Sequence, residues 1–288
     1  MRRPALRSAL LGALVAALTA CSAPATEPGP SPAPTTVATP ATPSGAPSTA
    51  PSIDIHAPPG WVSLSDVDST IQQDIRYYGG HNFLGRQVNG YLEPICVLPR
   101  PTAEALHRVQ ANALAEGYSL KVYDCYRPAR AGEDFVRWAH DPTDQKTKTE
   151  FYPQVDKSQL FNLGYVGSGA SSHSSGSAVD LTLVPVPPPP QRPYVAGEPL
   201  VSCTAPVGQR FPDNTIDMGT GYDCFDSLSH TFDGRIIGTA RDNRLRLKRL
   251  MATGGFVNYD REWWHYDLAN PPYRGQYFNF PVARAALT

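Results

Sequence analysis

The feature that most limits how this chain can fold is a proline-rich stretch near its N-terminus. Between residues 22 and 59 there are 11 prolines in 38 positions, mixed with alanine, threonine, serine and glycine. The stretch holds two charged residues, Glu27 and Asp54, and no Phe, Trp or Tyr. Such a composition cannot bury a core, so we expect a disordered, extended tether over residues 21–59. The remaining residues, 60–288, are about 230 in number and are enough for one well-buried domain.

The first 21 residues have the pattern of an export signal. A basic start, Met1-Arg2-Arg3, precedes an apolar run over residues 8–20. The run of about 13 residues is too short to span a bilayer and is typical of a signal peptide. It ends in Leu18-Thr19-Ala20-Cys21, which resembles a bacterial lipobox. We therefore expect residues 1–20 to be removed and Cys21 to be lipidated, which would anchor an exported protein to the outer face of the cell membrane. An ordinary secretory signal with a chance cysteine is the alternative.

Four cysteines lie in the folding part of the chain: Cys96, Cys125, Cys203 and Cys224. An even number in an exported protein favours two disulfides, for which three pairings exist. We favour Cys96–Cys125 and Cys203–Cys224, because each closes a moderate local loop. A structural zinc site on the four thiolates is the alternative, and the lack of any CxxC pair argues against it.

Charge and hydrophobic patterning indicate the fold class. The chain has 25 basic and 26 acidic residues, a balance that argues against a nucleic-acid partner. No feature predicts a protein partner. Apolar spacing and turn residues predict helices over 106–114, 129–140 and 242–251, strands over 118–126 and 178–184, and a strand and turn over 256–268. This mixture favours an α+β fold over a doubly wound parallel sheet.

One predicted strand carries a carboxylate. Val179, Leu181 and Leu183 alternate with Asp180 and Thr182, which is typical of a half-buried strand with a polar face. In an extended chain His173 would lie more than about 20 Å from Asp180, at about 3.3 Å per residue. The Ser/Gly-rich sequence around Gly176 allows a turn that brings the imidazole back beside the strand.

Two further motifs complete a possible reaction site. Glu262-Trp263-Trp264-His265 adds a second imidazole and a carboxylate, and Asp124-Cys125-Tyr126-Arg127-Pro128 adds an arginine at a strand end. Two histidines and an aspartate make a three-ligand site suited to zinc, with the fourth position open to water. Glu262 could then take a proton from that water, and Arg127 could stabilise an oxyanion. Taken singly, these residues have plainer interpretations: a loop histidine, a surface carboxylate, and an arginine paired with Asp124.

The order of these motifs resembles that of the M15 family of zinc peptidases. The patterns are SxHxxGxAxD over residues 171–180 and ExWH over residues 262–265. The longer strings SSHSSGSAVDLTL, DCYRP and EWWHY resemble the D-alanyl-D-alanine dipeptidase branch, which is linked to vancomycin resistance. The resemblance runs from about Asp66 to Pro281, with the motifs in the same order.

The resemblance implies a fold and a set of site residues. The fold would be a single α+β domain with a mainly antiparallel sheet, shared with D,D-carboxypeptidases and the hedgehog signalling domain. One zinc ion would lie on His173, Asp180 and His265, with Glu262 as general base and Arg127 stabilising the transition state. Tyr77 would line the substrate pocket, and Ser171 and Asp223 would hold the free ammonium group of the substrate.

The implied activity is hydrolysis of the dipeptide D-alanyl-D-alanine to two D-alanine molecules. A D,D- or L,D-carboxypeptidase that trims peptidoglycan stem peptides is the alternative, although it would need an open cleft rather than an ammonium pocket. A zinc-stabilised binding module that has lost catalysis is a third, and the presence of Glu262 and Arg127 argues against it. Export favours wall recycling or dipeptide scavenging over resistance, because an exported enzyme cannot reach a cytoplasmic pool.

Some positions depart from the family pattern. Ser175 stands where relatives often carry arginine. The stretch over residues 185–203 is longer than in compact relatives, and we expect it to reshape the rim of the pocket. The remaining histidines lack a partner motif, and we interpret them as structural or exposed: His56, His81, His107, His140 and His230.

Overall fold

The computed structural model describes residues 54–167 and 169–287. The predicted signal peptide, Cys21 and most of the predicted tether lie outside these residues. The strands are β1 (Trp61–Ser63), β2 (Gln72–Gln73), β3 (Val97–Pro99), β4 (Tyr118–Asp124), β5 (Ala178–Pro185), β6 (Phe256–Asn258) and β7 (His265–Leu268). The α-helices are α1 (Arg100–Ala115), α2 (Ala129–His140), α3 (Lys148–Phe151) and α4 (Gly238–Thr253). None of the helices in this part of the chain is long and apolar enough to cross a membrane.

The main sheet has five strands in the order β2-β4-β5-β7-β6. The β2–β4 pair is parallel and the other three pairs are antiparallel. Strands β1 and β3 form a separate antiparallel pair. The fold is therefore α+β with a mainly antiparallel sheet, as expected.

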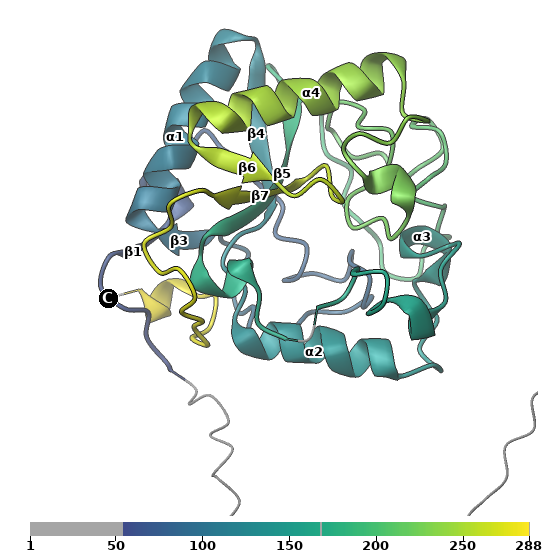
Figure 1. Ribbon diagram of the computed structural model, residues 1–288, viewed down its shortest axis with the longest axis horizontal. Helices are drawn as coiled ribbons and strands as arrows, with labels where there is room; N and C mark the ends of the chain where they lie inside the picture. Colours follow the sequence, from purple (N-terminus) through teal and green to yellow (C-terminus); the bar gives the residue numbers. More distant parts are fainter. Residues whose placement is uncertain (1–53, 168, 288) are drawn as a thin grey trace, which may run out of the picture. The chain divides into compact units, whose positions relative to one another are not determined.

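Helices α1 and α4 pack against each other and against the sheet, while α2 lies on the other side of the molecule (Figure 1). Helix α1 buries Leu106, Val109 and Ala113 on one face, as the apolar spacing predicts. It begins earlier than that spacing suggests, because Pro101 is tolerated in the first turn, where the backbone N–H has no partner within the helix.

Strand β5 is buried on both faces, so the prediction of a half-buried strand was wrong. Asp180 and Thr182 are as inaccessible as the apolar residues between them. The irregular segment after residue 203 covers the polar face: the Ile216 amide bonds to the Leu183 carbonyl, and the Tyr222 hydroxyl donates to Asp180. The carboxylate of β5 is consequently held away from bulk water.

Covalent and backbone links close the domain. The structure contains the two favoured disulfides, Cys96–Cys125 and Cys203–Cys224. A backbone hydrogen bond joins the two ends of the domain: the Ala57 amide donates to the Ala286 carbonyl at 2.8 Å. Ala57 is buried by this contact, so the last residues of the predicted tether lie against the folded domain.

Candidate metal centre and active site

The three residues predicted to bind a metal converge on one point. His173 Nε2 lies 3.3 Å from Asp180 Oδ1 and 3.2 Å from His265 Nδ1. The distance from His265 Nδ1 to Asp180 Oδ1 is 3.1 Å. A tetrahedral ion with bonds of about 2.0–2.1 Å separates its donor atoms by about 3.3 Å. The nitrogen and oxygen donors thus fit a zinc-sized ion in type and in spacing.

Strand pairing and a glycine turn bring these ligands together. In the β5–β7 pair, Asp180 is the register partner of His265. His173 lies on a short 3-10 helix, η3 (Ser172–Ser175), which Gly176 ends with a φ of +69°. A Cβ atom on Gly176 would lie 2.5 Å from atoms of both Trp61 and Pro99, so this turn needs glycine.

Each ligand imidazole has a second partner that fixes which nitrogen is free. His173 Nδ1 donates to the Cys125 carbonyl at 2.7 Å, and His265 Nε2 donates to Asp267 Oδ2 at 3.3 Å. Metal-binding histidines typically donate through their second nitrogen in this way. Asp267 was not predicted from the sequence, although side chains two residues apart on a strand share a face, so the position of His265 on β7 could have indicated it.

In the metal-free site, Asp180 and His265 stabilise each other's charged forms. Burial favours the neutral form of Asp180, but His173 and His265 outweigh burial and lower its pKa. In the metal-free site burial opposes protonation of His265, whereas hydrogen bonds to Asp180 and Asp267 raise its pKa to about 10. A proton and a metal ion therefore compete for the same cluster.

Glu262 lies in the turn between β6 and β7, with Oε2 3.8 Å from His265 Nδ1. Burial raises the pKa of the Glu262 carboxyl above its usual value, although His265 opposes the shift. A carboxylate whose pKa moves toward neutrality is suited to accept a proton and return it.

Arg127 combines both interpretations made from sequence. Its Nε and Nη2 atoms bond to Asp124 Oδ2 at 2.9 and 2.8 Å, while Nη2 also lies 3.6 Å from Asp180 Oδ2. Asp124 is fully buried, and its other oxygen accepts a 2.5 Å bond from Tyr91. The salt bridge thus fixes the guanidinium beside the metal ligands.

A second group of residues lies on the substrate side. The Tyr77 hydroxyl donates to Asp223 Oδ2 at 2.8 Å. Burial and the nearby Asp180 raise the pKa of Asp223 well above its usual value. Among the described residues no cation forms a salt bridge with Asp223, so a ligand ammonium would supply the missing partner. Ser171 is the N-cap residue of η3, and among the described residues its buried hydroxyl has no hydrogen-bond partner.

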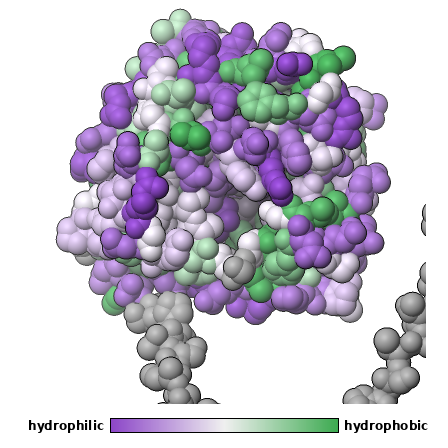
Figure 2. Space-filling model, viewed as in Figure 1, coloured by the Kyte–Doolittle hydropathy of each residue, from purple (hydrophilic) through white to green (hydrophobic). Residues whose placement is uncertain are grey.

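All eight predicted site residues line one cavity of about 290 Å³: Tyr77, Arg127, Ser171, His173, Asp180, Asp223, Glu262 and His265. Helix α2 contributes Gly132 and Phe135 to the wall, and the face in Figure 2 is hollowed near its centre. The five other histidines do not line the cavity. The structure therefore gathers the sequence-predicted site into a single, partly open cavity.

Neither departure from the family pattern reaches this cavity. Ser175 bonds to Ser172 and Ser177 and does not line the wall. The expectation that the stretch over residues 185–203 reshapes the rim was also wrong, because none of these residues lines the cavity. The stretch packs elsewhere: Tyr194 stacks on His81, and the Cys203 amide bonds to the Glu150 carbonyl.

With this geometry established, comparison with known proteins identifies the family. The model of the peptidase M15 family, described as D-Ala-D-Ala dipeptidase, matches residues 59–185 and 212–283. The chain belongs to the M15 peptidases. As a member of this family it is a metallopeptidase, and His173, Asp180 and His265 form its candidate metal site.

Curated M15 relatives cover most of the chain. The D-alanyl-D-alanine dipeptidase of Enterococcus faecium is 35% identical over 223 residues, which span 77% of this chain and 98% of that protein. The Streptomyces coelicolor protein of the same name is 36% identical over 221 residues, 76% of this chain and 96% of its own. The Escherichia coli protein is 28% identical over 207 residues, 72% and 83% respectively.

Proposed function

We propose that this M15 peptidase hydrolyses D-alanyl-D-alanine to two D-alanine molecules, with one zinc ion on His173, Asp180 and His265. The observation that carries the proposal is the single cavity in which a three-donor metal site faces Asp223, a buried carboxylate that forms no salt bridge with any described residue. Relatives named D-alanyl-D-alanine dipeptidase, matched over nearly their whole length, support the same substrate.

The donor set supports zinc as the metal. Two imidazoles and one carboxylate are typical of catalytic zinc sites, which keep a further position open. A zinc ion in such a site lowers the pKa of water and polarises a carbonyl group. The hydrogen bonds of the two histidines leave one nitrogen of each free for the ion.

The chain's own residues then account for binding and proton transfer. The dipeptide ammonium pairs with Asp223 and the Ser171 hydroxyl, while Tyr77 holds the Asp223 carboxylate in place. Glu262 accepts a proton from the attacking water at its carboxylate and passes it to the leaving amine, so that water is consumed and one peptide bond is cleaved. Arg127 stabilises the negative charge that develops on the carbonyl oxygen.

The size of the cavity favours a short substrate. At about 290 Å³ it lies near the lower end of small-molecule pockets, which measure about 300–1,000 Å³. An ammonium anchor within this cavity fits a free dipeptide. In a stem peptide the amine is acylated and carries no charge, so the buried Asp223 carboxylate would have no ammonium partner.

The test is release of D-alanine by the purified protein with and without added zinc. D-alanyl-D-alanine is compared with an N-acylated D-alanyl-D-alanine peptide. Zinc-dependent hydrolysis of the free dipeptide alone is the expected result. Cleavage of the acylated peptide would instead indicate a carboxypeptidase, and no cleavage of either by zinc-loaded protein would indicate a binding module.

We further propose that the enzyme is exported and held at the outer face of the membrane by a lipid on Cys21. The basic start, the short apolar run and the Leu-Thr-Ala-Cys sequence support this location. Mass spectrometry of the N-terminal peptide from a membrane fraction tests it, and Cys21→Ser should move the protein out of that fraction. An unmodified Cys21 in the wild-type protein would refute the lipid anchor.

A further inference from the structure

A tyrosine outside the predicted site contacts one of the metal ligands directly. Tyr222 is 6% exposed, and its hydroxyl donates a 2.9 Å hydrogen bond to Asp180 Oδ2. The other oxygen of the same carboxylate, Oδ1, is the one that faces His173 and His265. Tyr222 thus bonds to the oxygen that points away from the metal position.

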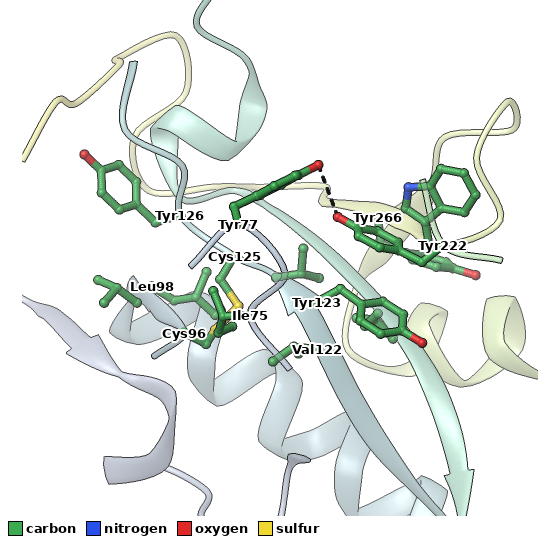
Figure 3. Packing of buried hydrophobic residues seen from close by; sticks show 14 of the residues in the cluster. Ile75, Tyr77, Cys96, Leu98, Val122, Tyr123, Cys125, Tyr126, Tyr222 and Tyr266 are labelled. Atoms are coloured by element: carbon green, nitrogen blue, oxygen red, sulfur yellow. Dashed lines mark hydrogen bonds between the residues drawn. A yellow bond between two sulfur atoms is a disulfide. The ribbon is translucent and has the colours of Figure 1, made fainter. Parts of the chain in front are cut away.

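The same hydroxyl lies beside the residues that hold the substrate side. Tyr222 Oη is 3.4 Å from Tyr77 Oη (dashed in Figure 3), and Tyr77 donates to Asp223. Because each tyrosine has one hydroxyl proton, which goes to its carboxylate, the contact between the two hydroxyls is the weakest of the three. These contacts form a row that connects the metal side of the cavity to its substrate side: Asp180, Tyr222, Tyr77 and Asp223.

Packing fixes the ring of Tyr222. It stacks on Tyr123 with ring centres 4.4 Å apart and meets Trp264 edge-on at 5.5 Å. The Tyr123 hydroxyl bonds to Asp213, which is not a metal ligand, and its contact with Tyr222 is made by the ring. A phenol ring packed against two aromatic neighbours presents its hydroxyl at a defined point rather than following the carboxylate.

Without that hydroxyl, the Asp180 carboxylate would have a competing partner. Arg127 Nη2 lies 3.6 Å from Oδ2, just beyond hydrogen-bond distance. A carboxylate released from Tyr222 can rotate toward this cation, which draws Oδ1 away from the two imidazoles. Partners that orient a ligand typically change metal affinity or activity by about 10–100-fold when removed.

We propose that Tyr222 is a positioning residue for the metal site, which holds Asp180 so that Oδ1 faces the ion. The effect on turnover rests on the proposed dipeptidase function, but the effect on metal affinity does not. Tyr222 immediately precedes Asp223, so one short segment sets both the orientation of a metal ligand and the place of the substrate anchor.

The test is the zinc affinity of Tyr222→Phe, measured by competition with a chromogenic chelator in the absence of substrate. Removing the hydroxyl while keeping the ring should weaken zinc binding by about 10–100-fold. Tyr123→Phe is the matched control, because it loses a hydroxyl bond to Asp213 and none to a metal ligand; its zinc affinity should change less than about twofold. An unchanged affinity in Tyr222→Phe would refute the proposal.

Two further measurements separate positioning from folding and from the reaction. The metal-free forms of Tyr222→Phe and Tyr123→Phe should melt within a few degrees of each other, since each loses one buried hydroxyl bond. At saturating zinc, Tyr222→Phe should lower kcat by about tenfold or more while KM changes little. A rise in KM at unchanged kcat would instead place Tyr222 in substrate binding. If the wild-type protein cleaves no dipeptide, the proposed function fails while the affinity comparison still decides the role of Tyr222.

Discussion

The two halves of the cavity are built in different ways. On the metal side, Asp180 and His265 are register partners in the β5–β7 pair, so regular backbone pairing sets their spacing. On the substrate side, Asp223 lies in an irregular segment and has a φ of +54°, in the left-handed region. Among the described residues it is the one non-glycine with a positive φ, and such strain is often kept at functional sites.

The supports of the two halves also differ. The Cys203–Cys224 disulfide joins the segment of Asp223 to the stretch over residues 186–211, which the family match leaves out. The Cys96–Cys125 disulfide instead supports the metal side, because the Cys125 carbonyl accepts the bond from His173. A substitution that moves the metal ligands must therefore disturb the sheet. The position of Asp223, in contrast, can change through the loops and the Cys203–Cys224 disulfide without disturbing the sheet.

The largest effect should come from breaking the metal side. His265→Ala removes a donor that β7 places opposite Asp180, so the protein should lose its metal and more than about 10⁴-fold of its activity. Zinc content by mass spectrometry and D-alanine release provide the measurements. His107→Ala, at an exposed position that contacts Asp68, is the control. Full zinc content in His265→Ala would remove this residue from the ligand set.

Removing the proposed base should separate chemistry from metal binding. Glu262→Ala should retain zinc and lose about 10²–10⁴-fold in kcat, because general acid–base catalysis typically contributes this amount. Single-turnover hydrolysis and zinc content are measured on the same preparation. Normal turnover by this variant would show that another group accepts the proton.

The substrate side should respond through binding. Asp223→Asn keeps the shape but removes the charge that pairs with the ammonium, so kcat/KM should fall by about 30-fold or more, mainly through KM. Zinc affinity should stay at the wild-type value, in contrast to Tyr222→Phe. Steady-state kinetics with the free dipeptide and a chelator titration make the comparison, and an unchanged KM would contradict the anchor role.

Removing each disulfide should affect a different half of the cavity. Replacing either pair by serine should lower the free energy of unfolding by about 3–4 kcal/mol, given loops of 29 and 21 residues. Cys203→Ser with Cys224→Ser should raise KM, whereas Cys96→Ser with Cys125→Ser should weaken zinc binding. Urea unfolding, KM and zinc affinity are measured for both variants. The same pattern of losses in both would show that the halves are not supported separately.

The smallest effect is expected on the free energy of unfolding as the pH is lowered. Arg76 and Lys121 lower the pKa of Asp74 to about 2 despite its burial, and they also lower that of Asp213. Because these folded-state pKa values lie below the ordinary value of 3.8, the contribution to stability is complete above about pH 4 and is lost as the pH falls toward 2. Asp74→Asn should remove about 1 kcal/mol near neutral pH and progressively less as the pH falls through about 2. Urea unfolding across this range checks the slope, and a constant difference would contradict it.

The sequence predicted the site better than its surroundings. Side-chain type and spacing around His173, Gly176 and Asp180 were enough to predict the turn that brings the imidazole back to the strand. Tyr222 was not predicted as a site residue, because its role depends on a contact between segments far apart in the chain. The burial of both faces of β5 was missed for the same reason, since an irregular segment without periodicity covers it.

The hydrogen bond between Ala57 and Ala286 places the beginning and the end of the folded domain side by side. Ion pairing of Arg284 with Asp66 reinforces the same junction. A chain with neighbouring ends can be circularly permuted or inserted into a surface loop of another protein without stretching its core. This peptidase domain could therefore be displayed within a host scaffold, with new termini opened in an exposed turn remote from the cavity.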